Sequence, residues 1–229
     1  MPVLDELVPA IESSPLALDA IRLELGETIA VGGGDLDTLL YAYDGAGSLE
    51  LGTESAELEA RTAAIVLAGE TGAVTAGPSG LELVRATVSS SADRHAPLGR
   101  RETVVSLEDA ARDQATGSRS FQILFGPYNG SIRATLFAGF VPPGKAPWHY
   151  HLYDEIVWIP DGPGRLLSGD RVVDLSAGSA FRLRPREVHI VENADADREM
   201  TLIGIFTPAG SPSAAYLTPD VAAEYQFSG

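Results

Sequence analysis

The sequence predicts an all-β protein made of two β-barrels in tandem. Three observations lead to this prediction: an internal repeat, a series of short strand-like segments in each copy, and turn residues scattered along the chain. The 229 residues include 24 Gly and 15 Pro, which is typical of short strands joined by tight turns. A chain of this length holds one large domain or two of common size, and its 45% hydrophobic residues suffice for packed cores.

The internal repeat relates two stretches of the chain at a constant offset of 117 residues. Residues 37–74 align with residues 154–191 without a gap, and 11 of the 38 pairs are identical. Chance would give roughly three or four identities in a chain this rich in Gly, Ala and Leu. Shared turn chemistry explains the matching glycines but not the constant offset, so we infer a duplication.

Each copy contains a series of short runs with the length and composition of β-strands. The segment Asp161-Gly162-Pro163-Gly164 supplies the positive φ and the fixed φ that tight turns need, and Asp44-Gly45-Ala46-Gly47 matches it in the first copy. Many short strands at near-regular spacing indicate a sandwich or a barrel. The expected strands are residues 39–43, 48–51, 63–67 and 81–87 in the first copy and 131–140, 156–159, 171–175, 180–184, 188–191 and 200–206 in the second.

These strands divide the chain into three parts. Residues 1–88 are expected to form the first barrel, residues 120–229 the second, and residues 89–119 a polar connector between them. Within the connector, residues 107–114 are expected to form one or two helical turns, with Ser106 as the cap.

A formal net charge of −16 argues against two classes of partner. Such a field repels phosphate backbones and anionic lipid headgroups, so neither nucleic acid nor a membrane surface is expected. Residues 1–6 are acidic and lack the features of a signal peptide, and no apolar run is long enough to span a bilayer. The expected location is the cytoplasm. Because the chain has no cysteine, any metal must be held by nitrogen and oxygen ligands.

Three of the four histidines lie within residues 149–189. His149 and His151 are two residues apart, so on a β-strand both side chains point to the same face and can share one ion. Glu155 follows four residues later, where a turn would start the neighbouring strand on the same interior. His189 arrives from a later strand. The sequence therefore predicts a metal site made by these four residues.

Three neutral imidazoles and one carboxylate suit Fe, Mn, Zn, Ni or Cu better than Ca or Mg. Four ligands that approach from one wall of a barrel would leave coordination positions of the ion open. Open positions indicate catalysis, since a structural site is usually closed. A His-x-His pair alone is more often a polar surface feature, and the Glu and the third His are what favour a metal site here.

The segment around the first two histidines resembles the first sequence motif of the cupin family. It has a glycine (Gly144), two histidines one residue apart (His149 and His151), a glutamate (Glu155) and a further glycine (Gly162). Four residues separate Gly144 from His149, where five are usual.

Residues 178–185, with His189 and Asn193, resemble the second cupin motif. This segment departs from the motif at Glu187, where glycine is usual, and in having one residue fewer between Pro185 and His189. The resemblance covers the C-terminal half directly and most of the N-terminal half through the repeat. It implies two double-stranded β-helix (jelly-roll) barrels, with the four residues named above ligating one divalent metal. Cupin barrels often pair through exposed strands, so the resemblance leaves two alternatives open: a homodimer, or a monomer in which the N-terminal barrel occupies that surface.

The first barrel is expected to bind no metal. At the offset of 117, the four predicted ligands correspond to Gly32, Gly34, Thr38 and Gly72. None of these residues can replace an imidazole or a carboxylate. The remaining histidine, His95, lies in the connector and is expected at the surface.

The wall of the pocket depends on which face of residues 180–184 points inward. In one interpretation, Phe181 and Leu183 face the metal and form an apolar substrate pocket. In the other, Arg182 points inward and anchors an anion. Burying an unpaired guanidinium is costly, so we favour the apolar pocket. A pocket without converging basic residues also argues against sugar-phosphate substrates.

Three functions remain open on the sequence. The apolar pocket and the resemblance to the many oxygenases of the family favour a dioxygenase with Fe²⁺ and a small aromatic or enolic substrate. The second function is a Lewis-acid isomerase, cyclase, decarboxylase or hydrolase, with Zn²⁺ or Mn²⁺ polarising a carbonyl and Glu155 as the catalytic base. Ni²⁺ and Cu²⁺ also suit the ligands. The third is a non-catalytic ligand-binding cupin, which the intact ligands of the second copy argue against.

Overall fold

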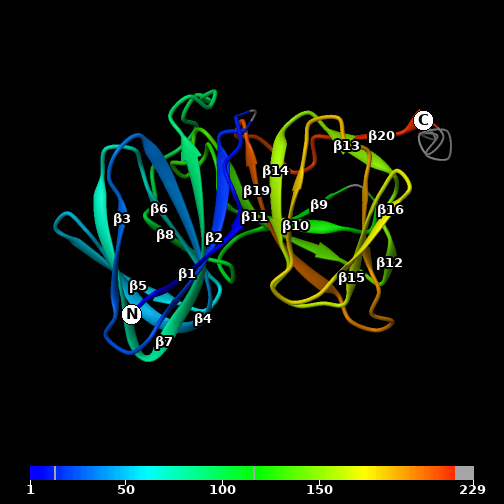
Figure 1. The fold of residues 1–229 in the computed structure, drawn as a ribbon. Helices are drawn as coiled ribbons and strands as arrows, with labels where there is room; N and C mark the ends of the chain where they lie inside the picture. Colours follow the sequence, from blue (N-terminus) through cyan, green and yellow to red (C-terminus); the bar gives the residue numbers. More distant parts are fainter. Residues whose placement is uncertain (13, 116, 220–229) are drawn as a thin grey trace.

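The computed structural model describes residues 1–12, 14–115 and 117–219. The regular elements of this part of the chain are β-strands, and they form two barrels that lie side by side (Figure 1). The all-β class and the two tandem barrels that the repeat predicts are thereby confirmed. The described ranges contain no candidate for a membrane-crossing helix.

The first barrel is an antiparallel sheet with the strand order β1-β2-β7-β4-β6-β8, in which β3 also pairs with β7 and β5 with β4. The long strand β4 pairs with β6 before a register shift and with β5 after it. Gly45, with φ of 77°, lies at this shift, so the predicted turn at residues 44–47 bends a continuous strand instead of ending it. The strands are β1 Val3–Val8, β2 Leu16–Leu23, β3 Thr28–Gly32, β4 Leu36–Leu51, β5 Glu54–Glu59, β6 Thr62–Val66, β7 Thr71–Ser89 and β8 Val104–Ser106.

The second barrel is built from three sheets. A six-stranded sheet has the order β17-β14-β19-β11-β10-β9, a four-stranded sheet has the order β12-β18-β15-β16, and β13 pairs with β20. The strands are β9 Arg112–Gln114, β10 Ser120–Phe125, β11 Thr135–Val141, β12 Gly144–Lys145, β13 His149–His151, β14 Asp154–Trp158, β15 Gly164–Ser168, β16 Arg171–Leu175, β17 Ala180–Leu183, β18 Ile190–Asn193, β19 Met200–Thr207 and β20 Ala215–Leu217.

The segment expected to be a polar connector contributes a strand to each barrel. β8 pairs with β6 of the first barrel, and β9 pairs with β10 of the second. The prediction of a helix over residues 107–114 is wrong. The amide of Asp109 donates to the carbonyl of Ser106 in a single turn, and the chain then extends into β9. The open edge of β10 offers backbone hydrogen bonds that a short isolated helix cannot match.

The repeat is visible in the hydrogen bonds as well as in the sequence. In the first barrel the amide of Gly69 donates to the carbonyl of Gly34 at 2.8 Å. In the second barrel the amide of Arg186 donates to the carbonyl of His151 at 2.7 Å, at positions 117 residues further along in both cases. Gly69 and Arg186 both have positive φ. The two copies therefore share the turn that carries the chain past the predicted ligand strand.

The two barrels pack against each other through a shared apolar core. The rings of Tyr43 on β4 and Trp158 on β14 meet across this interface, with centroids 4.7 Å apart. Each barrel also has an apolar core of its own in its interior. The interface core contains buried residues from both halves, including Leu39, Ile65, Phe125, Ile156 and Ile203.

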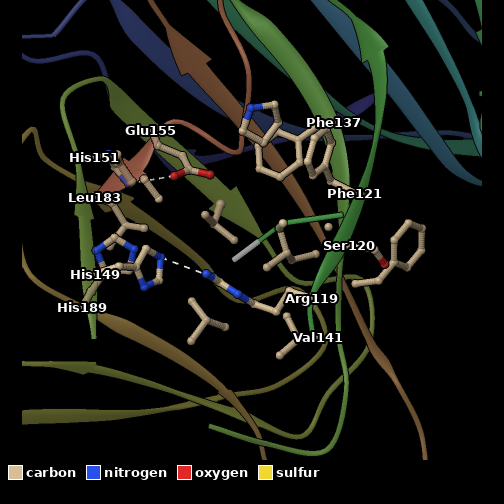
Figure 2. Close-up of a pocket in the computed structure, with 18 of the residues that line it drawn as sticks. Arg119, Ser120, Phe121, Phe137, Val141, His149, His151, Glu155, Leu183 and His189 are labelled. Carbon is tan, nitrogen blue, oxygen red and sulfur yellow. Dashed lines mark hydrogen bonds and ion pairs between the residues drawn. The ribbon is translucent and has the colours of Figure 1, made fainter. Parts of the chain in front are cut away.

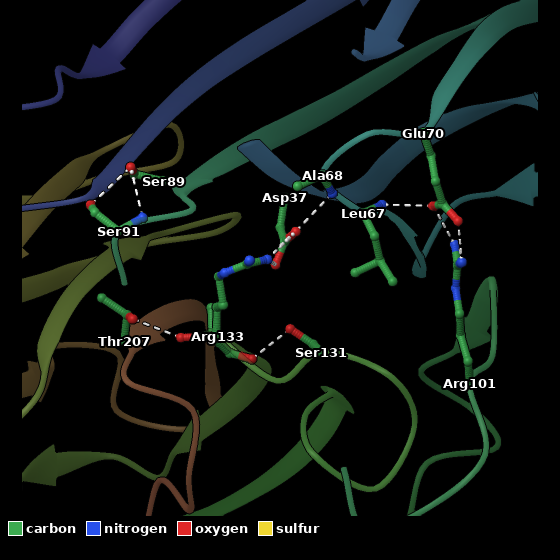
Figure 3. Close-up of polar contacts among 11 residues, drawn as sticks. Asp37, Leu67, Ala68, Glu70, Ser89, Ser91, Arg101, Ser131, Arg133 and Thr207 are labelled. Carbon is green, nitrogen blue, oxygen red and sulfur yellow. Dashed lines mark hydrogen bonds and ion pairs between the residues drawn. The ribbon is translucent and has the colours of Figure 1, made fainter. Parts of the chain in front are cut away.

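A buried ion pair joins the barrels beside this core (Figure 3). Nη1 of Arg133, which precedes β11, donates to Oδ1 and Oδ2 of Asp37 on β4 at 2.8 and 2.9 Å. Oδ1 of Asp37 also accepts from the amide of Ala68. The backbone around Arg133 is held by the hydroxyl of Thr207, which donates to its carbonyl at 2.6 Å. Because both charged groups are paired and hydrogen-bonded, the pair is tolerated in the interior.

The repeat equivalent of Asp37 makes the matching connection on the second barrel. Asp154, on β14, accepts from Nη1 of Arg182 at 2.7 Å and from the hydroxyl of Ser14. Nη2 of Arg182 donates to the carbonyls of Pro9 and Leu16 at 3.0 and 2.9 Å. Arg182 therefore points away from the barrel interior and holds the N-terminal segment against the second barrel.

Candidate metal centre

Short strands place the four predicted ligands together. His149 and His151 lie at the two ends of β13, with both side chains directed inward. Tyr150, between them, points the other way and stacks on Tyr216 of β20 with ring centroids 5.4 Å apart. His189 precedes β18 and exchanges two backbone hydrogen bonds with His149.

The four side chains converge on one side of a cavity in the second barrel (Figure 2). The ring centroids of His149 and His189 are 4.4 Å apart, and those of His151 and His189 are 5.0 Å apart. Oε2 of Glu155, on β14, lies 2.9 Å from Nε2 of His151. All four residues are at most 5% exposed. Such burial is rare for these residue types unless the groups have partners.

Each of the three imidazoles is oriented by a backbone carbonyl. Nδ1 of His149 lies 2.8 Å from the carbonyl oxygen of Pro147, and Nδ1 of His151 lies 2.9 Å from that of Tyr153. Nδ1 of His189 lies 2.8 Å from the carbonyl oxygen of Glu187. Because a carbonyl can only accept, Nδ1 carries the proton of the neutral ring and Nε2 keeps its lone pair. Metal-binding histidines are commonly fixed in this way.

The protonation of the rings follows from their surroundings. Burial lowers the pKa of His149 to about 2, with a further contribution from the charge of Arg119. Burial likewise lowers the pKa of His189. Burial also acts to lower the pKa of His151, but the adjacent Glu155 outweighs it and the net pKa of His151 is raised. His149 and His189 are therefore neutral near pH 7, as metal ligands must be.

The cavity beside these residues has a volume of about 70 Å³. Leu183 of β17 lines it, whereas Phe181 does not line the cavity and packs against the same core two residues away. Arg182 is excluded from the cavity by its contacts with Asp154 and the N-terminal segment. The remaining apolar wall comes mainly from Phe121, Phe137, Phe140, Val141, Val157, Val191 and Leu202.

Arg119 also lines the cavity, and the sequence reasoning missed it. It directly precedes β10, and its Nη1 lies 3.3 Å from Nε2 of His149 (Figure 2). The expectation of a pocket without basic residues is therefore wrong. Strand parity could have identified Arg119, because it is two residues from Phe121 and shares its face. Its assignment to the connector concealed this relation.

The donor set fits a metal in its chemistry, although not in its present arrangement. Nε2 of His151 is buried, and its one close polar contact is with Oε2 of Glu155 at 2.9 Å. A buried imidazole nitrogen and a carboxylate oxygen at this separation are the donor types that bind one divalent ion together. As the side chains stand, however, no group of three or more His, Asp or Glu residues in the described ranges is arranged to hold a metal ion. His149 instead faces Arg119.

Comparisons with known proteins agree with the described architecture. A family model described as "Cupin domain" matches residues 137–206. A solved structure of a mutant oxalate decarboxylase from Bacillus subtilis is similar over 93% of this chain and 74% of its own, with a TM-score of 0.74 and 13% identity. A second structure of that enzyme, from work on its Mn(II) centres, has the same coverage and TM-score with 14% identity. At this identity the similarity concerns the fold.

Two curated relatives match a shorter stretch. The L-ectoine synthases of Rhodococcus opacus (strain B4) and Rhodococcus jostii (strain RHA1) are each 36% identical over 63 residues. This stretch is 27% of the present chain and 46% of each relative. The chain thus spans about half the length of these curated relatives.

Proposed function

Because this chain is a two-barrel member of the cupin superfamily, we propose that it is an enzyme whose second barrel holds one divalent metal. His149, His151 and His189 would bind the ion through Nε2, and Glu155 would bind it through its carboxylate. The observation that carries the proposal is the set of three Nδ1–carbonyl hydrogen bonds, which leaves three Nε2 lone pairs in one cavity.

We infer that the reaction is non-redox Lewis-acid chemistry, such as a decarboxylation, an isomerisation or a cyclisation. A bound divalent ion would polarise an oxygen of the substrate and stabilise the negative charge that develops there. The similar proteins bear the names of a decarboxylase and a synthase, which favours this class over the dioxygenase expected from the sequence. Mn²⁺ is the ion named in the second neighbour's study and suits the three-nitrogen, one-oxygen donor set.

The chain's own residues would orient the ligands and exclude water. Tyr153 stacks on His151 with ring centroids 4.1 Å apart and on Phe206 at 4.0 Å, so the His151 ring is held on its face as well as at Nδ1. Burial raises the pKa of the Tyr153 hydroxyl, which therefore stays protonated. Glu155 is the candidate base, since its carboxylate is buried at the edge of the cavity. The apolar wall would strengthen each of these electrostatic interactions.

Metal content is the first test of the proposal. Protein purified without chelator should contain about one divalent ion per chain, and His149→Ala or His189→Ala should remove it while the circular dichroism stays unchanged. His95→Ala is the matched control, because His95 is exposed and lies outside the cavity. A wild-type protein without stoichiometric metal would leave a non-catalytic ligand-binding cupin as the better function.

The apolar wall keeps a dioxygenase as the second candidate. Oxygen uptake by the Fe²⁺-loaded protein with catechol-like or enolic compounds distinguishes a dioxygenase from a non-redox Lewis-acid enzyme. We expect no substrate-dependent uptake. Uptake that disappears in His149→Ala would favour the dioxygenase instead.

A further inference from the structure

We propose that Ser14, Asp154 and Arg182 form a cluster through which the first barrel positions two candidate metal ligands of the second barrel. The two ligands are His151 and Glu155, which lie on either side of Asp154 in the chain. This inference rests on the proposed function, since it assigns positioning residues to the same metal site. It gives the first barrel, whose equivalent positions hold no ligand, a part in the site of the second.

Asp154 belongs to the short segment that carries both of these ligands. It begins β14, Glu155 is the next residue, and successive side chains of a strand point to opposite faces. Glu155 lines the cavity, whereas Asp154 faces away from it and binds Arg182. His151 is tied to the same segment, because its Nδ1 lies 2.9 Å from the carbonyl oxygen of Tyr153. A shift of the backbone at Asp154 would therefore move the donor atoms of both ligands.

The carboxylate of Asp154 is held from the first barrel. The hydroxyl of Ser14, which precedes β2, donates to Oδ2 of Asp154 and accepts from Nη1 of Arg182. Nη1 of Arg182 also donates to Oδ2 of Asp154 at 2.7 Å. A hydroxyl has one donor and two acceptor positions, so Ser14 can make both contacts at once. The surrounding strands meet in the same place, since β2 contacts β14 and β1 contacts β17.

Arg182 binds the N-terminal segment at two further points. Its Nη2 donates to the carbonyls of Pro9 and Leu16 at 3.0 and 2.9 Å. The side chains of Arg182 and Asp154 are each only 10% exposed. A buried ion pair adds little net stability compared with apolar residues of similar size, but its hydrogen bonds fix one arrangement of the groups. The main effect of the cluster is therefore to fix the position at which β14 begins.

The repeat contains the same kind of tie in the opposite direction. Asp37 of the first barrel, the equivalent of Asp154, is held by Arg133 from the second barrel. Each aspartate is thus held by a residue from the other barrel. Only Asp154 is followed by a candidate ligand, because the residue after Asp37 is Thr38. The tie at Asp37 is therefore a matched control for the positioning role of Asp154.

The test measures Mn²⁺ affinity by calorimetry and ligand geometry by the EPR spectrum of the Mn²⁺-saturated protein. Asp154→Asn removes the charge that holds Arg182 and should weaken Mn²⁺ binding about ten-fold, the lower end of the effect of groups that orient metal ligands. Ser14→Ala removes one hydroxyl and should weaken binding about three-fold. In both variants the zero-field splitting of the bound ion should differ from that of the wild type. Ser14→Thr keeps the hydroxyl, beside a hollow of about 420 Å³, and should bind Mn²⁺ as the wild type does.

Variants at the equivalent positions distinguish positioning from a general loss of stability. Asp37→Asn breaks a tie whose carboxylate is only 1% exposed, so it should lower the free energy of unfolding at least as much as Asp154→Asn. Its Mn²⁺ affinity and EPR spectrum should stay unchanged. Ser131→Ala is the control for Ser14→Ala, since Ser131 lies 117 residues further along and donates to the carbonyl of Ala134 at 2.6 Å. It does not line the cavity, so Mn²⁺ binding should again stay unchanged.

The outcomes separate this inference from the proposed function. Asp154→Asn that binds Mn²⁺ as tightly as the wild type, with the same spectrum, overturns the positioning role and leaves the metal site standing. Equal weakening in Asp37→Asn also overturns it, because any loosening of the barrels would then suffice. Unchanged binding in Ser14→Ala overturns the part assigned to the first barrel. Wild-type protein that binds no Mn²⁺ overturns the proposed function, and this inference with it.

Discussion

The two barrels share a strand path and a turn, but one presents histidines where the other presents glycines. The equivalents of His149 and His189 are Gly32 and Gly72. A Cβ atom at Gly32 would lie 2.5 Å from Cγ1 of Val66 and 2.6 Å from the carbonyl oxygen of Glu70. At Gly72 it would lie 2.7 Å from the carbonyl oxygen of Glu50. The first barrel has therefore closed around the positions equivalent to His149 and His189, whereas Gly34, the equivalent of His151, has open space beside it.

This difference separates the residues that hold the fold from the residues of the candidate site. The matched hydrogen bonds of Gly69 and Arg186 persist in both copies and hold the turn, whatever the neighbouring side chains are. The candidate site, by contrast, depends on a few side chains that one copy lacks entirely. Function in such a duplicated fold resides in the site and not in the barrel.

The largest expected effect comes from breaking the buried ion pair that joins the two barrels. Arg133→Met leaves the Asp37 carboxylate, only 1% exposed, without its cation, and should lower the free energy of unfolding by about 3–5 kcal/mol in urea titrations. Metal content per folded molecule should not change, because the pair lies outside the candidate site. The double variant Asp37→Leu/Arg133→Met should recover most of the loss. A single variant as stable as the wild type would contradict the structural role of this pair.

The next prediction tests whether the first barrel has closed. Gly32→Ala adds a Cβ against Val66 and Glu70 at a φ of 73°, and should lower the free energy of unfolding by about 2–4 kcal/mol. Gly34→Ala also has a positive φ but meets nothing within 4 Å, so its loss should be about 1–2 kcal/mol. Equal losses in urea titrations would show that crowding does not distinguish these positions.

The sequence predicts the fold well because the repeat and the turn glycines can be identified from the residues themselves. It also predicts that His149, His151 and Glu155 come together, because strand parity and a single turn determine their directions. The structure places all of them, with His189, around one cavity, and their role as metal ligands stays a prediction. Local signals of this kind need no knowledge of tertiary contacts.

Features that depend on distant contacts escaped prediction. Arg119 enters the cavity from a segment that reads as a polar connector, and β9 forms there because β10 offers an open edge. Phe181 has the parity of Leu183, yet the cavity does not extend to it. The pairing of Asp37 with Arg133 spans 96 residues, and no pattern near either residue indicates it.

The pH dependence of the free energy of unfolding should show that the histidines of the second barrel make the protein less stable in acid. In metal-free protein, His149 and His189 have lowered pKa values in the folded state, so the unfolded chain binds more protons below about pH 6.5. Their effect is to reduce stability as the pH falls from 6.5 towards 2. The raised pKa of His151 acts in the opposite direction, since its contribution is present below pH 6.5 and is lost as pH rises through the folded pKa.

The His149 and His189 imidazoles each contribute at most about 1.4 kcal/mol per pH unit, so together they should give a slope of about 1.4–2.7 kcal/mol per pH unit below pH 6. The double variant His149→Ala/His189→Ala keeps only His151. Its free energy of unfolding should therefore fall less than that of the wild type as the pH is lowered below 6.5. The free energies of unfolding of the two proteins are measured by urea titration at several pH values. In their difference, the contributions of the carboxylates that both proteins contain cancel. Parallel profiles would mean that the two imidazoles are not buried in the neutral form.

The smallest effect should come from a contact beside a second hydrogen bond that both copies of the repeat keep. Glu70 and Glu187 each accept a turn amide, from Leu67 at 2.8 Å and from Arg184 at 3.1 Å. Glu70 also binds Arg101 in a half-exposed ion pair (Figure 3). Arg101→Gln should therefore lower the free energy of unfolding by less than about 1 kcal/mol, with a dependence on salt. A larger loss would mean that the Arg101 contact, and not the shared turn, holds the first barrel closed.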